Sequence, residues 1–136
     1  MTKLPVKKPV QKQRFVLHEH DATHHHFDFR LEQQGVLKSW ALPKGMPYNI
    51  GNRRLAVETE NHPMEWLTFQ GKIPEGEYGA GTVKIKDHGY YKQLFWSPEK
   101  IEFVLEGKTF KGKYVLIPFK KEKKQWLMIR VAMGVM

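Results

Sequence analysis

The stretch HHFDFRLEQQGVLKSWALP at residues 25–43 decides the fold class that the sequence predicts. In its first half, Phe27 and Phe29 alternate with polar residues, and a period of two is typical of a β-strand with one buried face. The following QQG at residues 33–35 indicates a turn, and VLKSWALP at residues 36–43 has the composition of a second strand. The stretch therefore predicts an antiparallel β-hairpin.

Short β-rich segments of the same kind recur through most of the chain. They are RFVLHEH at 14–20, RRLAVETE at 53–60, TVKIKD at 82–87, YYKQLFW at 90–96, KIEFVLEG at 100–107, KYVLIPF at 113–119 and QWLMIRVA at 125–132. The pair HG at residues 88–89 indicates a turn, and SPEKIE at residues 97–102 indicates a helical turn. Regularly spaced short strands with so little helix predict an all-β fold, either an antiparallel barrel or a sandwich.

The length of the chain favours one domain. With 136 residues the chain can bury a core of its own, which we expect at residues 14–136. Residues 1–13 carry four lysines, two prolines and no acidic residue, so we expect a flexible basic arm there.

Charge and cysteine content restrict the function. Lys and Arg number 23 against 14 Asp and Glu, and the net charge of +9 indicates a polyanionic partner: nucleic acid, an anionic membrane or a phosphorylated substrate. The lack of cysteine excludes disulfides and thiolate metal ligands and is typical of a reducing compartment. No stretch approaches the ~18 apolar residues of a membrane span, and we find no secretory signal, so we expect a cytoplasmic protein without a membrane anchor.

Histidines crowd into residues 18–30, which hold five of the seven in the chain. On a strand, His26 and Asp28 share one face at a spacing of about 7 Å, so both can reach one divalent ion. His20, at the end of the preceding strand, could come opposite them in a hairpin. Two imidazoles and a carboxylate suit Mn²⁺, Fe²⁺ or Zn²⁺, whereas the alternative is a polar strand face without metal. Weaker claims belong to His18, His24 and His25.

Several basic side chains are candidates for binding phosphate. Arg30 continues the polar face of the metal candidates, and a guanidinium can bind two phosphate oxygens at once. Lys44 and the pair Arg53–Arg54 follow in loop or strand-start positions, and His62 precedes Pro63; each of these taken singly is most often a surface residue. The segment GEYGAGT at residues 76–82 resembles a glycine-rich phosphate loop only superficially, because no Lys-Ser/Thr pair follows it.

Three separated motifs resemble one known family. They are RFVLHEHDATHHHFDFRLEQQGVLKSWALPKG at 14–45, RLAVETENHP at 54–63 and GKIPEGEYGAGTV at 71–83. In this order they closely resemble the 3′-phosphoesterase domain of bacterial DNA ligase D and its free-standing relatives, over residues 14–119. The resemblance implies a single antiparallel β-barrel of about eight short strands with one or two short helical turns. It also implies an enzyme that prefers Mn²⁺, with Co²⁺ or Zn²⁺ as other candidates, and that removes a 3′-phosphate, or in fused enzymes a terminal ribonucleoside, in end-joining repair.

The same resemblance assigns site residues and partners. The implied metal ligands are His20, His26 and Asp28. The implied phosphate-binding residues are Arg30, Lys44, Arg54, His62 and Trp66, of which Arg30 and His62 are catalytic. Trp66 stands where the family usually has a tyrosine, and no acidic residue precedes Glu19, whereas ligase D proteins carry Arg, Asp and Glu ahead of the barrel. The implied partners are 3′ termini of DNA or RNA-ended DNA, with a separate ligase, polymerase and Ku system as candidates and no membrane.

Metal-assisted hydrolysis is the mechanism that this interpretation favours, with the cationic side chains neutralising phosphate charge. Two alternatives come from other classes. One is a non-haem Fe(II) oxygenase, in which His62 instead of His20 would complete the metal triad. The other is a non-catalytic barrel, in which basic and tryptophan side chains would bind single strands.

Overall fold

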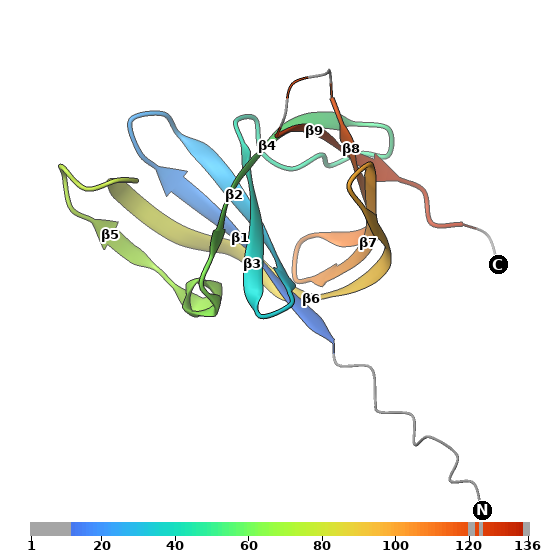
Figure 1. The fold of residues 1–136 in the computed structure, drawn as a ribbon, viewed down its shortest axis with the longest axis horizontal. Coiled ribbons are helices and arrows are strands. Elements are labelled where there is room, and N and C mark those ends of the chain that lie inside the picture. The colour runs from blue at the N-terminus through green and yellow to red at the C-terminus, as the bar shows by residue number, and fades with distance from the viewer. Residues whose placement is uncertain (1–11, 120–121, 123, 135–136) are drawn as a thin grey trace, which may run out of the picture.

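The computed structural model describes residues 12–119, 122 and 124–134, and its fold is all-β, as the sequence predicts. The described residues form nine strands and one short 3-10 helix, η1, and Figure 1 shows how the strands are arranged. The elements are β1 (Gln13–Asp21), β2 (His26–Gln33), β3 (Val36–Leu42), β4 (Arg53–His62), η1 (Met64–Thr68), β5 (Gly71–Ile73), β6 (Gly81–Ser97), β7 (Lys100–Gly107), β8 (Lys111–Pro118) and β9 (Gln125–Val131). Residues 1–11 of the expected basic arm lie outside the described residues.

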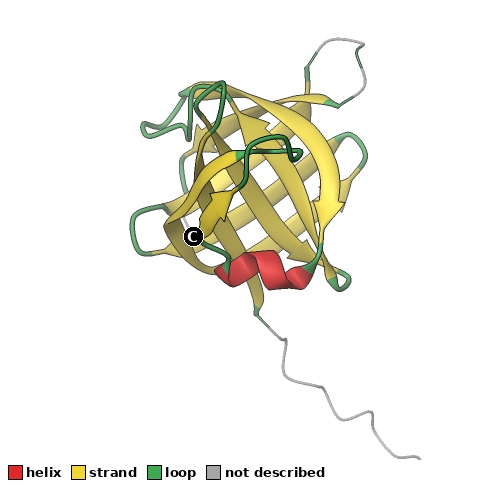
Figure 2. Ribbon diagram, turned by 90° about the vertical axis from the view of Figure 1, so that its left-hand side faces the viewer, coloured by secondary structure: helices red, strands yellow, loops and turns green. Residues whose placement is uncertain are grey.

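Eight of these strands close into an antiparallel barrel. Along the sheet the order is β1-β2-β3-β4-β9-β8-β7-β6, and a further pairing of β1 with β6 joins the two ends. The short strand β5 adds to the free side of β6 outside this ring. Because the sheet closes (Figure 2), each of the eight strands has a hydrogen-bonded neighbour on both sides for at least part of its length. Closure thus pairs backbone N–H and C=O groups that the edge strands of an open sandwich would leave unpaired.

Strand β6 corrects two expectations from the sequence. The HG pair at residues 88–89 is not a turn, because β6 runs unbroken for 17 residues and pairs first with β1 and then with β7. Gly89 lies where the two pairings overlap, with φ +157°, and a Cβ atom there would collide with the carbonyl oxygen of Glu106. Glycine therefore permits the close approach at this corner of the barrel. SPEKIE at 97–102 forms the β6–β7 hairpin turn and the start of β7, and the one helical turn of the described residues is η1 instead.

The barrel strands carry different side chains on their two faces. In β1, Phe15 and Leu17 point into the barrel and join its main core, with Phe29 of β2 and Trp40 of β3. The intervening side chains point outward, where Val16 belongs to a second, smaller cluster. Burying each large apolar side chain contributes about 1.5–3 kcal/mol, so the inward face secures the fold and leaves the outward face of the same strands for other groups.

That outward face is partly covered. The helix η1 packs against β1 and β3, and its Leu67 is buried in the second apolar cluster with Val16 and Leu37. Strand β5 and the segment at residues 74–80 follow η1 and lead back into β6. The covering elements and the outer face of β1–β4 enclose the space that is described below.

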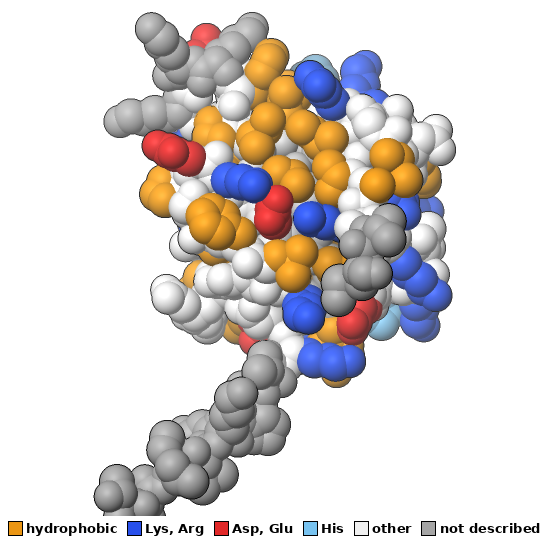
Figure 3. Space-filling model, turned by 90° about the vertical axis from the view of Figure 1, so that its right-hand side faces the viewer, with side chains coloured by type: hydrophobic (Ala, Val, Ile, Leu, Met, Phe, Trp, Pro, Cys, Tyr) orange, Lys and Arg blue, Asp and Glu red, His pale blue; other side chains and the backbone are white. Residues whose placement is uncertain are grey.

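Basic side chains are not confined to one end of the molecule. Figure 3 shows the side on which β7 and β8 lie, where Lys and Arg side chains are spread among hydrophobic ones. Among the described residues, no helix has both the length and the apolar composition needed to cross a membrane.

Candidate metal and phosphate site

A cavity of about 940 Å³ lies between the outer face of β1–β4 and the segment from η1 to β6. Its lining includes His24 and six of the eight site residues that the family resemblance implies: His20, His26, Asp28, Arg30, His62 and Trp66. Lys44 and Arg54 are not among the lining residues. The fold thus brings the three candidate metal ligands and part of the cationic set into one space.

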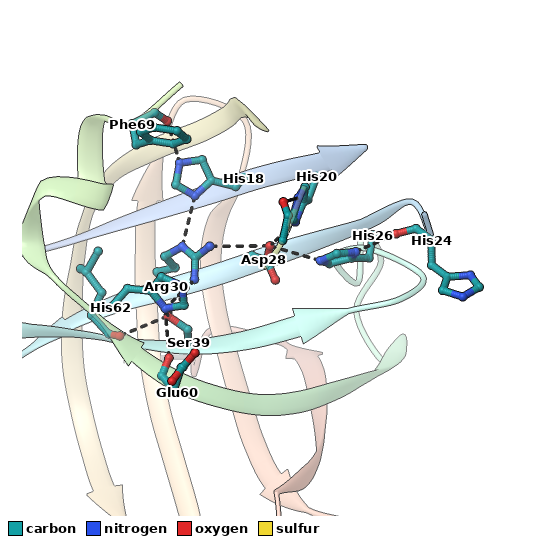
Figure 4. Close-up of polar contacts among 12 residues, drawn as sticks. His18, His20, His24, His26, Asp28, Arg30, Ser39, Glu60, His62 and Phe69 are labelled. Atoms are coloured by element: carbon teal, nitrogen blue, oxygen red, sulfur yellow. Dashed lines mark hydrogen bonds and ion pairs between the residues drawn. The ribbon is translucent and has the colours of Figure 1, made fainter. Parts of the chain in front are cut away.

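The three candidate metal ligands converge in this cavity (Figure 4). In the register of β1 and β2, His20 lies opposite His26, and Asp28 follows two residues later on the same face. Oδ2 of Asp28 lies 3.5 Å from Nδ1 of His20 and 3.2 Å from Nε2 of His26. One ligand atom from each of the three lies within 4.8 Å of the others, which is close enough for a single ion to bind all three.

Backbone carbonyl groups fix the tautomers of both histidines. Nε2–H of His20 donates to the carbonyl oxygen of Gly79 at 2.7 Å, and Nδ1–H of His26 donates to that of His24 at 2.8 Å. In each ring, the nitrogen facing Asp28 can then present a lone pair to a metal. The donor set, two imidazoles and one carboxylate, fits a divalent transition metal.

The electrostatics of the three residues also favour a cation among them. When Nε2 of His26 is also protonated, its hydrogen bond to Asp28 stabilises the charged ring and raises the pKa of His26 above its usual 6.5, although partial burial opposes this. Burial disfavours the charged form of Asp28, but the hydrogen bond from His26 and the charge of Arg30 outweigh it and lower the pKa of Asp28. Asp28 is therefore an ionised carboxylate at neutral pH, as a metal ligand must be.

Arg30 lies beside the ligands and is only 3% exposed. Its Nε–H donates to Nδ1 of His18 at 3.2 Å, and Nη1–H donates to Oγ of Ser39 at 3.0 Å. Its Nη2 lies 3.6 Å from Oδ2 of Asp28, and the guanidinium carbon lies 5.4 Å from the ring centroid of Trp66. Burial lowers the pKa of Arg30, yet a guanidinium remains charged near neutral pH. The result is a fixed cation next to the carboxylate of the metal site.

His18, which had only a weak claim from the sequence, has a defined place in this network. It is fully buried, and its Nε2–H donates to the carbonyl oxygen of Phe69 at 3.0 Å, so Nδ1 is free of hydrogen and accepts from Arg30. Burial, followed by the charge of Arg30, lowers the pKa of His18 to about 4. The ring is therefore neutral near pH 7. The sequence signal for it is the spacing of two from His20, which puts both on the outer face of β1.

His62, the last residue of β4, contacts Arg30 from another side. Its Nδ1 lies 3.2 Å from Nη1 of Arg30 and 3.0 Å from the carbonyl oxygen of Glu60. A guanidinium only donates and a carbonyl only accepts, so these contacts belong to different tautomers of the ring. Burial, followed by the charge of Arg30, lowers the pKa of His62. Trp66 lies edge-on to this ring, with centroids 5.1 Å apart.

The remaining two cationic candidates lie apart from this group. Lys44 is exposed in the connection between β3 and β4, two residues beyond Leu42, which pairs with Phe27 of β2. Arg54 is the second residue of β4, where its Nη1–H donates to the carbonyl oxygen of Arg53 at 3.0 Å. Contact of either side chain with phosphate stays a prediction.

Three further residues that the sequence did not indicate either line the cavity or join the hydrogen-bond network around Arg30. Ser39 of β3 accepts from Arg30 and donates to the carbonyl oxygen of Leu37 at 3.1 Å. Lys72 and Tyr78 line the cavity from β5 and the segment that follows it. Ser39 follows the same alternation as the other outward residues, but β5 is only three residues long and left no detectable period in the sequence.

Fold and cavity together define a class of protein: a closed antiparallel barrel with a His-His-Asp group and a buried arginine on its outer face. Residues 18–118 match the model of the DNA ligase D 3′-phosphoesterase domain, so the chain belongs to this family. The family is one of hydrolases of phosphate esters, which agrees with the resemblance noted from the motifs.

Curated relatives support the same assignment. The chain is 47% identical over 120 residues to the multifunctional non-homologous end joining DNA repair protein LigD of Mycobacterium tuberculosis, covering 84% of this chain and 16% of the relative. It is 42% identical over 142 residues to LigD of Mycolicibacterium smegmatis, covering 93% and 18%. It is 38% identical over 137 residues to LigD of Pseudomonas aeruginosa, covering 96% and 16%. The chain thus spans less than a fifth of the length of these relatives.

Proposed function

We propose that the chain is a Mn²⁺-dependent phosphoesterase that heals 3′ ends of DNA or RNA-ended DNA. Removal of a terminal 3′-phosphate is its main reaction, and removal of a 3′-ribonucleoside is the second candidate reaction. The observation that carries the proposal is the shared use of Asp28. This carboxylate lies within the His-His-Asp group and also 3.6 Å from Nη2 of Arg30, so a phosphate oxygen bound at an ion there would lie beside a cation.

In this proposal His20, His26 and Asp28 hold the ion. A bound Mn²⁺ would supply Lewis acidity toward the phosphate and the attacking water. Mn²⁺ accepts mixed nitrogen and oxygen ligands, as do Co²⁺ and Zn²⁺, so the donor set supports this group of metals and the choice of Mn²⁺ rests on the family resemblance.

Arg30 and His62 are the proposed catalytic residues. Arg30 is held in place by His18 and Ser39 through Nε and Nη1, and Nη2 has a hydrogen to donate to a phosphate oxygen. When Nδ1 of His62 accepts from Arg30, the ring hydrogen is on Nε2, from which it can be donated to the phosphoryl group or to the leaving 3′ oxygen. The lowered pKa of His62 supports the first of these roles for the free site, because a neutral ring is a hydrogen-bond donor rather than a strong acid.

The other predicted phosphate contacts complete the proposal. Trp66 packs against Arg30 and His62 at the wall of the cavity. Lys44 and Arg54 lie outside the cavity lining, so we assign them to phosphates of the strand that leads away from the 3′ end.

The relatives support a proposal for the cellular role. The similar proteins are named for non-homologous end joining and DNA repair, and this chain matches less than a fifth of each. We therefore propose that it acts in end joining in the cytoplasm, together with ligase, polymerase and Ku functions. The net charge of +9 supports a nucleic-acid partner.

The oxygenase alternative would require His62 in the metal group. Its Nδ1 lies against Arg30 instead, and a guanidinium next to a ligand nitrogen disfavours a second cation. The non-catalytic alternative would leave the His-His-Asp group without a purpose. Family membership favours a phosphoesterase over both.

Phosphate release from a primer with a 3′-phosphate, compared with the same primer carrying a 5′-phosphate, tests the proposal. We expect Mn²⁺-dependent release from the 3′ end only, and no release with an Asp28→Asn variant that keeps its fold by circular dichroism. Equal release from both ends would overturn the 3′ specificity. Stoichiometric metal without any phosphate release, or consumption of O₂ with Fe²⁺, would overturn the phosphoesterase function itself.

A further inference from the structure

Tyr78 is an aromatic side chain left in solvent at the edge of the cavity. It is 92% exposed, the most among the large hydrophobic side chains of the described residues, and it lines the cavity. Tyr48 and Tyr90 are also exposed, but each has a neighbour for its ring: Phe110 at 5.2 Å between centroids, and the Lys12 ammonium at 5.5 Å. For Tyr78 no such ring or cation contact occurs within the described part of the chain. An exposed ring beside a site that handles polymer ends suggests a ligand that covers it.

The backbone around Tyr78 is tied directly to the metal group. The next residue, Gly79, accepts the hydrogen bond from Nε2 of His20 at 2.7 Å. The segment is also folded on itself, because Glu77 N–H donates to the carbonyl of Pro74 at 3.3 Å and Ala80 N–H donates to that of Glu77 at 3.1 Å. Tyr78 therefore directly precedes the residue that contacts the candidate metal ligand His20, and it lies on a segment with its own hydrogen bonds.

A cation lies on the same side of the cavity. Lys72 of β5 lines it, is exposed, and pairs in the sheet with Thr82 on the other arm of the β5–β6 hairpin. Together, Lys72 and Tyr78 offer a positive charge and an aromatic face next to the site of the terminal phosphate. A nucleotide strand presents the matching groups, since each phosphate is followed within one nucleoside by a flat base.

We propose that the β5–β6 segment forms the subsite for the 3′-terminal nucleoside, in which Tyr78 stacks on the terminal nucleobase and Lys72 contacts the phosphate on its 5′ side. The inference rests on the proposed function and adds the way in which the end of a strand is recognised. Stacking is tolerant of sequence because every base has a π-face, so this subsite accepts all four bases. It distinguishes a nucleic-acid end from a phosphate ester that lacks a base.

Fluorescence of 2-aminopurine tests the contact without using catalysis. The probe is a DNA strand with 2-aminopurine at the 3′-terminal nucleotide and a 3′-methylenephosphonate, which cannot be hydrolysed because carbon replaces the bridging oxygen. Wild-type protein with Zn²⁺ should quench the 2-aminopurine fluorescence of this strand. It should quench the fluorescence of a second strand, with 2-aminopurine four nucleotides from the end, less strongly. Tyr78→Ala should remove the difference between the two strands, whereas Tyr78→Trp should keep it. Equal quenching of both strands by the wild type would overturn the proposal.

Kinetics give a second, independent test. Loss of one base–aromatic stack should raise KM for a 3′-phosphate strand about 5- to 150-fold in Tyr78→Ala, which corresponds to about 1–3 kcal/mol, with little change in kcat. A strand whose terminal nucleotide is abasic should already have a high KM with the wild type. In Tyr78→Ala the KM values for the intact and the abasic strand should therefore become similar. Tyr48→Ala, which removes an exposed tyrosine elsewhere, should leave their difference intact.

The outcomes separate the two proposals. If wild-type protein releases no phosphate from either strand but still quenches the terminal probe, the proposed function fails and the nucleobase contact stands. If phosphate is released with the same KM from intact and abasic ends, the function stands and the role of Tyr78 is overturned. A uniform rise in KM for both ends in Tyr78→Ala would mean that the residue supports the cavity without contacting the base.

Discussion

Arg30 shows how single residues combine at this site. Its guanidinium is buried, and His18 and Ser39 hold two of its nitrogens while Asp28 balances its charge. A buried charge with this many partners is costly to disturb, because removing any partner leaves a polar group without its hydrogen bond. The position and the charged state of the Arg30 guanidinium are thus set by neighbours that do not themselves need to contact substrate.

The first prediction concerns His18 as a positioning residue. In His18→Ala, Nε of Arg30 loses its acceptor, so we expect the free energy of unfolding to fall by about 1–3 kcal/mol and kcat to fall while metal content is retained. His18→Gln, which can place an amide oxygen near the same point, should restore part of kcat. The checks are urea unfolding, steady-state kinetics and metal analysis. His88→Ala, at an exposed histidine, serves as the control, and a His18→Ala variant with unchanged kcat would refute the positioning role.

The second prediction concerns pH and His62. Because burial and Arg30 lower its pKa, the folded protein binds a proton at His62 less readily than the unfolded chain does. The contribution of this residue to stability is therefore complete above the unfolded pKa of about 6.5 and is lost as pH falls below it. In urea unfolding with EDTA, the wild type should lose more stability between pH 7 and pH 5 than His62→Gln does. An identical loss in both proteins would contradict the lowered pKa.

At the scale of elements, the β1–β2 hairpin supplies all three candidate metal ligands. Its register puts His20 opposite His26, and the turn between them supplies the carbonyl of His24 that orients the His26 ring. The second carbonyl, from Gly79, belongs to the segment between β5 and β6 and lies 59 residues away in sequence from His20. One element therefore provides the ligands, and two separate loops set their tautomers.

The third prediction tests this division of labour. His26→Ala removes a ligand and should lower the affinity for Mn²⁺ at least about tenfold, since a weaker donor set must bind the ion. His24→Ala keeps the backbone carbonyl that orients the ring and removes only an exposed side chain, so affinity should stay within about twofold. Mn²⁺ titration followed by electron paramagnetic resonance measures both. Equal loss in the two variants would mean that the side chain of His24 takes part in binding.

At the scale of the whole molecule, the barrel separates stability from function. Inward side chains form the main core, and the outward face of the same strands carries His18, His20, Asp28 and Arg30. Net charge is also a property of the whole chain, and at +9 it favours association with a polyanion.

The fourth prediction is that binding of a 3′-phosphate strand weakens steeply with salt, because each neutralised phosphate adds about −0.7 to −0.9 to the slope of log K against log salt. Residues 1–11 contain Lys3, Lys7 and Lys8. Deletion of residues 1–11 should therefore make the slope of log K against log salt shallower by up to about 2–3, with a smaller effect on turnover of a short primer. Replacing the three lysines with Gln should have the same effect as the deletion. An unchanged slope would mean that this segment does not contact nucleic acid.

The sequence by itself determined most of the strands, the all-β class and the His, His and Asp side chains that come together. Period-two alternation is a local property, so it revealed which residues of β2 share a face, and a hairpin needs only a short turn to bring His20 opposite His26. Local signals misled at residues 88–89, because glycine serves equally in a turn and at a bent strand where two neighbours approach closely.

Only the tertiary structure decided which residues surround Arg30 and what closes the cavity. His62 reaches Arg30 from β4, and the carbonyl of Phe69, at the end of η1, contacts His18. Nothing in the spacing of these two residues relates them to β2, whereas Ser39 is the hairpin partner of Arg30 across β2 and β3. Strand β5 is too short to have a period, yet it carries Lys72 and leads to Tyr78 at the cavity edge. Contacts between distant segments depend on how the sheet closes, and closure is a property of all eight strands together rather than of any one stretch.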